Sequence, residues 1–307
     1  MVSTTPQVPD ITRVRSVPTT VKDTPSYRVF RVVNGTALVV ICAITLYPFI
    51  NLVAKAFSSQ GEIMAGNVNL WPRGFNLTTL EWVFNQERFW TGYMNTLIQT
   101  FGGTAIAMVL TTTMAYALAK KHLKGRAFFI GMVVVTMFFN GGLVPNYLLI
   151  SGLGFKNTVW AIVIPNAISA FNLLVMKAFF ENFSSELEDA AAVDGLSTYG
   201  IFFRIVLPLS KAVIATMILF YAVAFWNSWF PAMLYLSDTD LQPVTLYLRN
   251  LLSGASGAGR EAGMEESQIG ANLQSVAMLL TVLPIVCLYP FVQKYFVSGV
   301  MLGSVKG

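Results

Sequence analysis

Charged residues are scarce in this chain of 307 residues. Asp, Glu, Lys and Arg together make up 11% of it, against about 25% in ordinary soluble domains. Aliphatic, aromatic and sulfur-containing residues supply 55%. Because so few charged residues cannot cover the surface of a soluble domain, the composition indicates an integral membrane protein.

The residue types that serve catalysis and metal binding are also few. His122 is the single histidine and lies in the basic segment 120–126, where a solvated surface role is expected. Cys42 and Cys287 fall in separate apolar stretches without metal-ligand spacing, and both are expected to be core residues. No glycine-rich phosphate loop with its lysine is present. The sequence therefore predicts a chain without a catalytic or metal site, which does not hydrolyse nucleotide by itself.

Six stretches free of charge are long enough to cross a bilayer, which needs about 20 residues. Their apolar character is continuous rather than alternating, and this favours helices over a membrane β-barrel. We therefore expect an all-α membrane protein with six transmembrane helices. The stretches are 32–54, 89–119, 127–155, 157–176, 212–237 and 267–293.

The basic residues predict how the chain is oriented. With the N-terminus inside, 14 of the 20 Lys and Arg residues fall on the cytoplasmic side, as the positive-inside rule requires. Both termini and the loop 184–208 are then cytoplasmic. The net charge of +5 reflects this topology and not nucleic-acid binding. The expected organisation is a cytoplasmic tail over 1–30, a six-helix transmembrane domain over 31–296 and a cytoplasmic tail over 297–307.

The polar loop 184–208 has the pattern of a helix-turn-helix between two spans. Ser185 and Glu188 have the spacing of a capping box, Gly195 supplies a left-handed stop, and Pro208 opens the next apolar run. Three alanines, 190–192, allow a neighbouring surface to approach the backbone closely, and the flanking carboxylates can pair with a basic partner. The loop is therefore predicted to dock another protein.

The same loop resembles the cytoplasmic signature of the ABC importer permeases. That signature is Glu-Ala-Ala, three residues, Gly, nine residues and Ile-x-Leu-Pro, and this chain matches it except that Asp189 replaces the glutamate. Four further segments are similar to the carbohydrate-uptake branch of this family, which includes maltose and multiple-sugar permeases. These segments are 140–147, 153–158, 241–246 and 297–307. The first two are also similar to the complex-oligosaccharide subgroup of that branch. The matching signature positions are Ala190, Ala191, Gly195, Ile205, Leu207 and Pro208, with Asp194 typical of the sugar branch.

The resemblance implies a half-transporter in the bacterial cytoplasmic membrane. A second permease subunit, two ATP-binding subunits and an extracytoplasmic solute-binding protein would complete it. ATP and Mg²⁺ would be bound by the ATPase subunits, so this chain would need no cofactor. The residues implied to couple it to the ATPase are Glu188, Asp189, Ala190, Ala191, Asp194, Gly195, Ile205, Leu207 and Pro208.

Two other classes of function compete with an ATP-driven importer. A secondary carrier would need carboxylates within the spans and a duplicated half, and neither is evident. A membrane scaffold or receptor would leave the loop 184–208 unexplained. Within the importer class, the solute could also be something other than a sugar.

Aromatic and amide residues suggest where a sugar would pass. Tyr221, Phe225 and Trp229 recur every fourth residue and would share one helix face. Aromatic faces stack on sugar rings and amides bind hydroxyls, although core packing explains the same stripe. Asparagines at membrane depth must find partners or line a wet cavity. The candidate path residues are Tyr221, Phe225, Trp226, Asn227, Trp229, Asn140 and Asn172, with Asn146 and Asn166 as further polar groups at this depth.

Overall fold

The computed structural model of the chain describes residues 24–257 and 270–303, and these contain helices and connections but no strand. The all-α prediction is therefore confirmed over the described residues. The chain divides into two compact units, the first ending at Ile50 and the second beginning at Asn51. Most of the predicted tails, residues 1–23 and 304–307, lie outside the described residues.

Helix α1 (Pro25–Ala56) accounts for the first unit and contains the predicted span 32–54. It begins inside the predicted N-terminal tail. In the first unit its large apolar side chains are exposed on all sides, as expected for a helix that faces lipid.

Two helices of the second unit are continuous where a span was predicted. Helix α4 (Glu87–Ala119) coincides with the stretch 89–119, and α15 (Gly270–Gly303) runs past the predicted end at 293 into the predicted C-terminal tail. Among the described residues, α1 and α4 are each long and apolar enough to cross a membrane, and up to four such spans result if each bent helix pair is one span. The count of six spans stays a prediction.

The predicted span 127–155 is broken. It forms α5 (Arg126–Phe138) and α6 (Leu143–Gly152), which are bent by 119°. Gly142 takes a φ of +90° in the break, a conformation open to glycine. The Asn140 side-chain oxygen accepts a hydrogen bond from the Gly142 N–H at 2.9 Å. The expectation of a continuous helix here was wrong, because hydropathy does not report this backbone turn.

The predicted span 157–176 is also interrupted. It contains the single turn α7 (Trp160–Val163) and most of α8 (Ala170–Glu181). Pro165 stands in the interruption and lacks the N–H that a continuing helix would need. Ser169 then caps α8, its side chain accepting a hydrogen bond from the Asn172 N–H.

In the predicted span 212–237 the first helix, α12 (Lys211–Trp226), ends before the predicted end of the span, and a second helix follows as α13 (Trp229–Tyr235). Pro231 provides the reason, because in a continuous helix its ring would clash with the carbonyl four residues earlier, at Asn227. Within the first turn of α13 the missing N–H costs nothing. Tyr221 and Phe225 therefore lie on α12, while Trp229 begins another helix.

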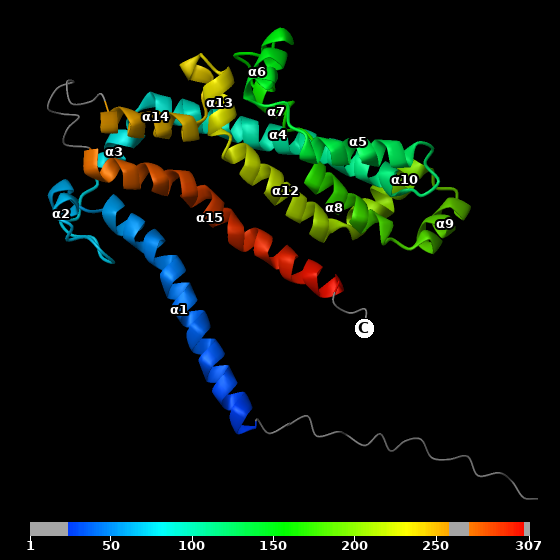
Figure 1. Cartoon of the computed structure of the whole chain (residues 1–307), viewed down its shortest axis with the longest axis horizontal. Coiled ribbons are helices and arrows are strands. Elements are labelled where there is room, and N and C mark those ends of the chain that lie inside the picture. Colours follow the sequence, from blue (N-terminus) through cyan, green and yellow to red (C-terminus); the bar gives the residue numbers. More distant parts are fainter. Residues whose placement is uncertain (1–23, 258–269, 304–307) are drawn as a thin grey trace, which may run out of the picture. The chain divides into compact units, whose positions relative to one another are not determined.

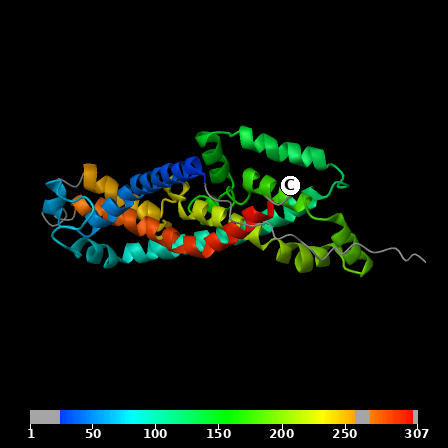
Figure 2. The ribbon, with the colours of Figure 1, turned by 90° about the horizontal axis from the view of Figure 1, so that it is seen from below.

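Helix α4 is the central element of the second unit, with α8, α12 and α14 (Val244–Gly257) packed against it, and α15 beside α12 and α14 (Figures 1 and 2). At Gly103 a Cβ atom would come within 2.8 Å of the Phe225 ring, so the missing side chain permits the close approach of α4 and α12.

The two ends of this second unit differ in what they carry. Helix α9 (Ser185–Val193) lies at the opposite end from α3 (Thr78–Phe84) and α14, as both views show (Figures 1 and 2). The signature loop is thus separated from α3 and α14 by the length of α4. The remaining short elements are α2 (Gln60–Met64), α10 (Thr198–Ile201), a π-helical turn (Phe202–Val206), α11 (Leu207–Leu209) and a 3₁₀ turn (Thr239–Leu241).

Candidate functional site: a docking helix and a cavity between broken helices

The loop 184–208, which is predicted to dock another protein and is called the docking loop below, begins with a short helix, α9, that ends at a glycine. Gly195 has a φ of +86°. The Leu196 N–H donates to the Ala191 carbonyl and the Gly195 N–H to the Ala192 carbonyl, both at 3.0 Å, which is the hydrogen-bond pattern of a Schellman motif. The predicted helix and its stop are therefore confirmed.

The start of this helix differs from the prediction. Ser184 occupies the N-cap position and Ser185 is the first helical residue, so Ser185 and Glu188 do not have capping-box positions. The Glu188 carboxylate instead forms an ion pair with Lys120 at the end of α4, and the Lys120 ammonium also lies 4.2 Å from the centre of the Tyr116 ring. Glu188 therefore tethers α9 within the chain.

The residues of the signature divide into a buried and an exposed set. Ala191, Ile205 and Leu207 pack into the core of the second unit, so they hold the loop in place. The exposed set forms the outer surface of the loop, which we call the docking surface. It comprises Asp189, Ala190, Ala192, Val193, Asp194, Gly195, Tyr199 and Pro208.

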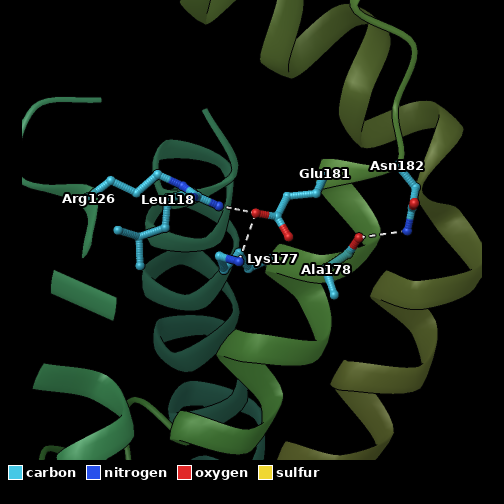
Figure 3. A network of polar contacts seen from close by, with 6 residues as sticks. All are labelled: Leu118, Arg126, Lys177, Ala178, Glu181 and Asn182. Atoms are coloured by element: carbon cyan, nitrogen blue, oxygen red, sulfur yellow. Dashed lines mark hydrogen bonds and ion pairs between the residues drawn. The ribbon is translucent and has the colours of Figure 1, made fainter. Parts of the chain in front are cut away.

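A second ion-pair network lies beside the docking helix (Figure 3). Glu181, the last residue of α8, binds Lys177 at 2.8 Å and Arg126 at the start of α5. The Arg126 Nε also donates to the Leu118 carbonyl at 2.8 Å. The hydrogen bond from Lys177, with the charges of Lys177 and Arg126, lowers the pKa of the Glu181 carboxyl, although burial acts in the opposite direction. The network joins the ends of α4, α5 and α8 next to α9.

A cavity of about 610 Å³ opens where the interruption between α7 and α8 lies against the turn between α12 and α13. Four of the candidate path residues line it, Asn172, Tyr221, Phe225 and Asn227, and thus come together from α8 and α12. None of the lining residues carries a charge. The others are Pro165, Asn166, Ile168, Ser169, Phe220, Ala224, Ser228 and Pro231.

The cavity presents polar groups that lack partners. Asn172 is 6% exposed, and its side-chain amide has no hydrogen-bond partner among the described residues. The Ser228 hydroxyl is buried and likewise unpaired within the part of the chain that the structure describes. The amide nitrogens of Asn166 and Asn227 donate to Ile162 and Val223, each one turn earlier, which leaves their side-chain oxygens as acceptors.

Two of the aromatic residues on the cavity wall also fix the helices. The Tyr221 hydroxyl accepts a hydrogen bond from the Ser169 N–H at 3.0 Å and shares a second one with the Thr111 hydroxyl at 2.6 Å. Tyr221 thereby connects α4, α12 and the start of α8. Phe225 fills the space over Gly103.

Three candidate path residues do not reach the cavity. Trp226 is buried and donates to the Thr281 carbonyl of α15 at 3.0 Å. Trp229 has the Arg249 guanidinium 3.5 Å from its ring centre. Asn140 caps the break between α5 and α6. The aromatic stripe expected on one continuous helix is thus split by the turn at 227–228.

Comparison with known proteins decides the class. Residues 127–301 match the model of the family described as binding-protein-dependent transport system inner membrane component. The chain belongs to this family. The permease is 39% identical to the protein LplC of Bacillus subtilis over 94% of its own length and 98% of that protein. It is 38% identical to the polygalacturonan/rhamnogalacturonan transport system permease protein YtcP of the same species, over 88% and 96%.

A solved structure is similar across nearly the whole permease. It belongs to a bacterial ABC transporter involved in the import of the acidic polysaccharide alginate, with a TM-score of 0.81, 30% sequence identity and coverage of 89% of this chain and 98% of that chain. The prediction of an ABC importer permease is confirmed, and the chain is an inner-membrane transport component rather than a secondary carrier or a scaffold.

Sequence reasoning overlooked two polar residues of the cavity. Ser169 and Ser228 were not proposed, because single serines in apolar stretches carry little signal. Each stands at a helix break near a proline, Pro165 or Pro231, and the combination of proline with nearby serine and asparagine would have pointed to both. Cys42 and Cys287 are exposed in the chain rather than buried, so their assignment to the core was wrong.

Proposed function

We propose that the permease forms one half of the path for a sugar or oligosaccharide in an ATP-driven importer. The observation that carries this proposal is the cavity between broken helices, which combines aromatic walls with unpaired amide and hydroxyl groups. The relatives support this proposal, because they include permeases for polygalacturonan/rhamnogalacturonan and for arabinooligosaccharides.

The chemistry of the cavity suits a polyhydroxylated solute. The side-chain oxygens of Asn166 and Asn227 are placed to accept hydrogen bonds from hydroxyls, and Asn172 offers donors. Phe220 and Phe225 supply apolar surface for the faces of sugar rings. Irregular backbone within a membrane is tolerated where it lines such a cavity, and discontinuous helices mark substrate sites in other transporters. We therefore assign Asn172, Tyr221, Phe225 and Asn227 to the sugar path.

The docking surface fits the role of a coupling element. Exposed carboxylates at Asp189 and Asp194 flank small residues, while Ala191, Ile205 and Leu207 anchor the loop to the helix bundle. A bound ATPase subunit could therefore move the bundle through α9. The proposed assembly contains a second permease subunit, two ATP-binding subunits that carry ATP and Mg²⁺, and a solute-binding protein. In it this chain has six spans with both termini in the cytoplasm.

Reconstitution with the ATPase, the second permease and the binding protein tests the proposal. Sugar loaded on the binding protein should stimulate ATP hydrolysis and enter the vesicles. Asn227→Leu should reduce uptake about tenfold while the basal ATPase rate persists, because one hydrogen bond to the sugar is lost. Asn182→Leu is the matched control, since Asn182 also donates to the carbonyl one turn earlier but lies outside the cavity.

The outcomes separate the possible solutes. Stimulation by peptides or amino acids, with no response to any sugar, would make this a permease for another solute class. Wild-type sugar uptake by Asn227→Leu would remove the amide from the path.

A further inference from the structure

An arginine on α14 contacts the helix that follows the cavity turn. The Arg249 guanidinium carbon lies 3.5 Å from the centre of the ring of Trp229, the first residue of α13. Helices α13 and α14 pack together (Figure 1). A guanidinium over an indole is attracted to the negative face of the ring. Within the described ranges Arg249 pairs with no carboxylate, so the ring is its electrostatic partner.

Helix α14 is a firm base for this contact. Val244, its first residue, donates its N–H to the buried Thr96 hydroxyl of α4 at 2.9 Å. The two backbones also approach closely, because a Cβ atom at Gly92 would come within 3.2 Å of Val244. Leu248, next to Arg249, is buried. Arg249 therefore extends from a helix whose position against α4 is fixed by a hydrogen bond and by close packing.

The cavity turn between α12 and α13 makes only local hydrogen bonds among the described residues. Asn227 and Ser228 line the cavity, and their N–H groups donate to the Val223 and Phe225 carbonyls of α12, each at 3.1 Å. The Asn227 amide donates to Val223 as well, and the Ser228 hydroxyl is unpaired. The position of the turn therefore depends on the residues that flank it.

A tryptophan flanks the turn on each side, and each is held by a different helix. Trp226, the residue before the turn, is buried and donates to the Thr281 carbonyl of α15. Trp229, the residue after it, is partly buried against the core and has the Arg249 guanidinium over its ring. The contact with Arg249 thus restrains the end of the turn at which Ser228 stands.

We propose that Arg249 is a positioning residue of the sugar path, whose contact with Trp229 holds Asn227 and Ser228 in place on the cavity wall. This inference rests on the sugar path proposed above and adds to it a residue outside the cavity. Arg249 is not among the lining residues, so it acts through Trp229 and the turn.

The reactivity of a thiol in the turn tests the positioning and needs no sugar. Ser228→Cys is introduced into the assembled transporter after Cys42 and Cys287 have been replaced by alanine, and its reaction with methyl methanethiosulfonate is followed. Ser228 is 6% exposed, so the thiol should react slowly. Arg249→Gln should raise the rate about two- to fivefold, as expected for the loss of a cation–π contact at an exposed site.

Conservative and double variants show whether the contact itself is responsible. Arg249→Lys keeps the positive charge and should restore most of the slow rate. Trp229→Leu should raise the rate, and adding Arg249→Gln to it should change nothing further, because the partner is already absent. Arg73→Gln is the control for loss of an exposed arginine, since Arg73 has no ring or carboxylate partner in the part of the chain that the structure describes.

A second reporter keeps the test decisive if Ser228→Cys does not assemble. A spin label on Asn227→Cys reports the mobility of the same turn. Its spectrum should sharpen when Arg249→Gln is added and should stay unchanged with Arg73→Gln.

Uptake measures the consequence for transport. Uptake of arabinotriose or trigalacturonate, delivered by the binding protein, should fall about two- to fivefold in Arg249→Gln and recover in Arg249→Lys, while the basal ATPase rate persists. Equal thiol rates in Arg249→Gln and the wild type would overturn the positioning role and leave sugar transport standing. Reduced uptake with an unchanged thiol rate would also overturn it and would assign Arg249 to contact with the binding protein. Failure of the wild type to take up any sugar would overturn the proposed function, whatever the thiol rates.

Discussion

At the scale of single residues, a substitution at Gly195 would strain the backbone without causing a steric clash. Its φ is +86°, yet a Cβ atom added there would meet no atom within 4 Å. A larger residue at this position therefore suffers only from the left-handed backbone, at about 1–2 kcal/mol for a residue without special tolerance of that region. The strain falls on the stop of α9 and so on the docking surface.

We therefore expect Gly195→Val to reduce sugar-stimulated ATP hydrolysis, because the Schellman hydrogen bonds that end α9 would be distorted. Gly195→Asn should retain most activity, since asparagine enters the left-handed region readily. Gly66→Val is the control for strain alone, because Gly66 has a φ of +73° with open space around it and lies far along the chain from α9. Normal coupling in Gly195→Val would remove the loop from the mechanism.

Gly103 and Gly102 form a natural pair for testing helix contact. A Cβ at Gly103 would come within 2.8 Å of the Phe225 ring, whereas one at Gly102 would meet nothing within 4 Å. Gly103→Val should lower the stability of the purified permease by about 1–3 kcal/mol through overpacking, and Gly102→Val should change it much less. Unfolding in detergent, followed by tryptophan fluorescence, measures the difference. Equal midpoints would mean that α4 and α12 do not pack through Gly103.

At the scale of helices, the sequence predicted the ends of α4 well because charged residues bound its apolar run at Arg88 and Lys120. It failed at the breaks inside 127–155, 157–176 and 212–237. Those breaks arise from Gly142, Pro165 and Pro231, which act on the backbone while the hydropathy stays continuous. The assumption of unbroken helices then placed Trp229 on the same face as Tyr221.

The ion pair between Glu188 and Lys120 links the docking helix to α4. Both side chains are about one-fifth exposed, so the pair contributes only about 1 kcal/mol or less to stability. Its larger effect should be on coupling, because it holds α9 at one position relative to α4. Glu188→Lys should lower transport with a small change in unfolding, and the double exchange Lys120→Glu with Glu188→Lys should restore transport. Equal loss in the single and double variants would show that the pair does not act as a tether.

The Glu181 network predicts a dependence on pH. Lys177 and Arg126 lower the pKa of the Glu181 carboxyl in the folded state below its ordinary value of 4.5. The network therefore stabilises the fold fully above that value, and this contribution is lost as the pH falls through the lowered pKa. Thermal unfolding from pH 7 to pH 3.5 should show a smaller acid-induced decrease for Glu181→Gln than for the wild type. Glu186→Gln, an exposed carboxylate outside the network, should follow the wild type.

At the scale of the whole molecule, the sequence located the docking loop more fully than the cavity. The loop is continuous in sequence, so its spacing was readable from residue 189 to residue 208. The cavity is assembled from α8 and α12, which are far apart in sequence, and its walls depend on how two interrupted helices pack together. The presence of polar residues in apolar runs identified Asn172 and Asn227 as candidates for the path, together with Asn140. Only the packing shows that Asn140 differs from the other two, because its side chain accepts a hydrogen bond within the break between α5 and α6.

The orientation of the second unit in the membrane provides the last prediction. The docking surface and the α3–α14 end lie at opposite ends of α4 (Figures 1 and 2), and the distribution of Lys and Arg assigns the first of these ends to the cytoplasm. A thiol in the docking loop and one at the C-terminal end of α3 should therefore react with a membrane-impermeant reagent from opposite sides.

Thr198→Cys and Asn85→Cys are suitable, because both positions are exposed and neither side chain lines the cavity. Cys42 and Cys287 are exposed as well and must first be replaced by alanine, so that the introduced thiol alone reports. In intact cells the reagent should label Asn85→Cys and spare Thr198→Cys, and in inverted vesicles the pattern should reverse. Labelling of Thr198→Cys from outside would place the docking surface on the side without ATP. No cytoplasmic ATPase could then reach it, and the coupling role of α9 would fall together with the topology.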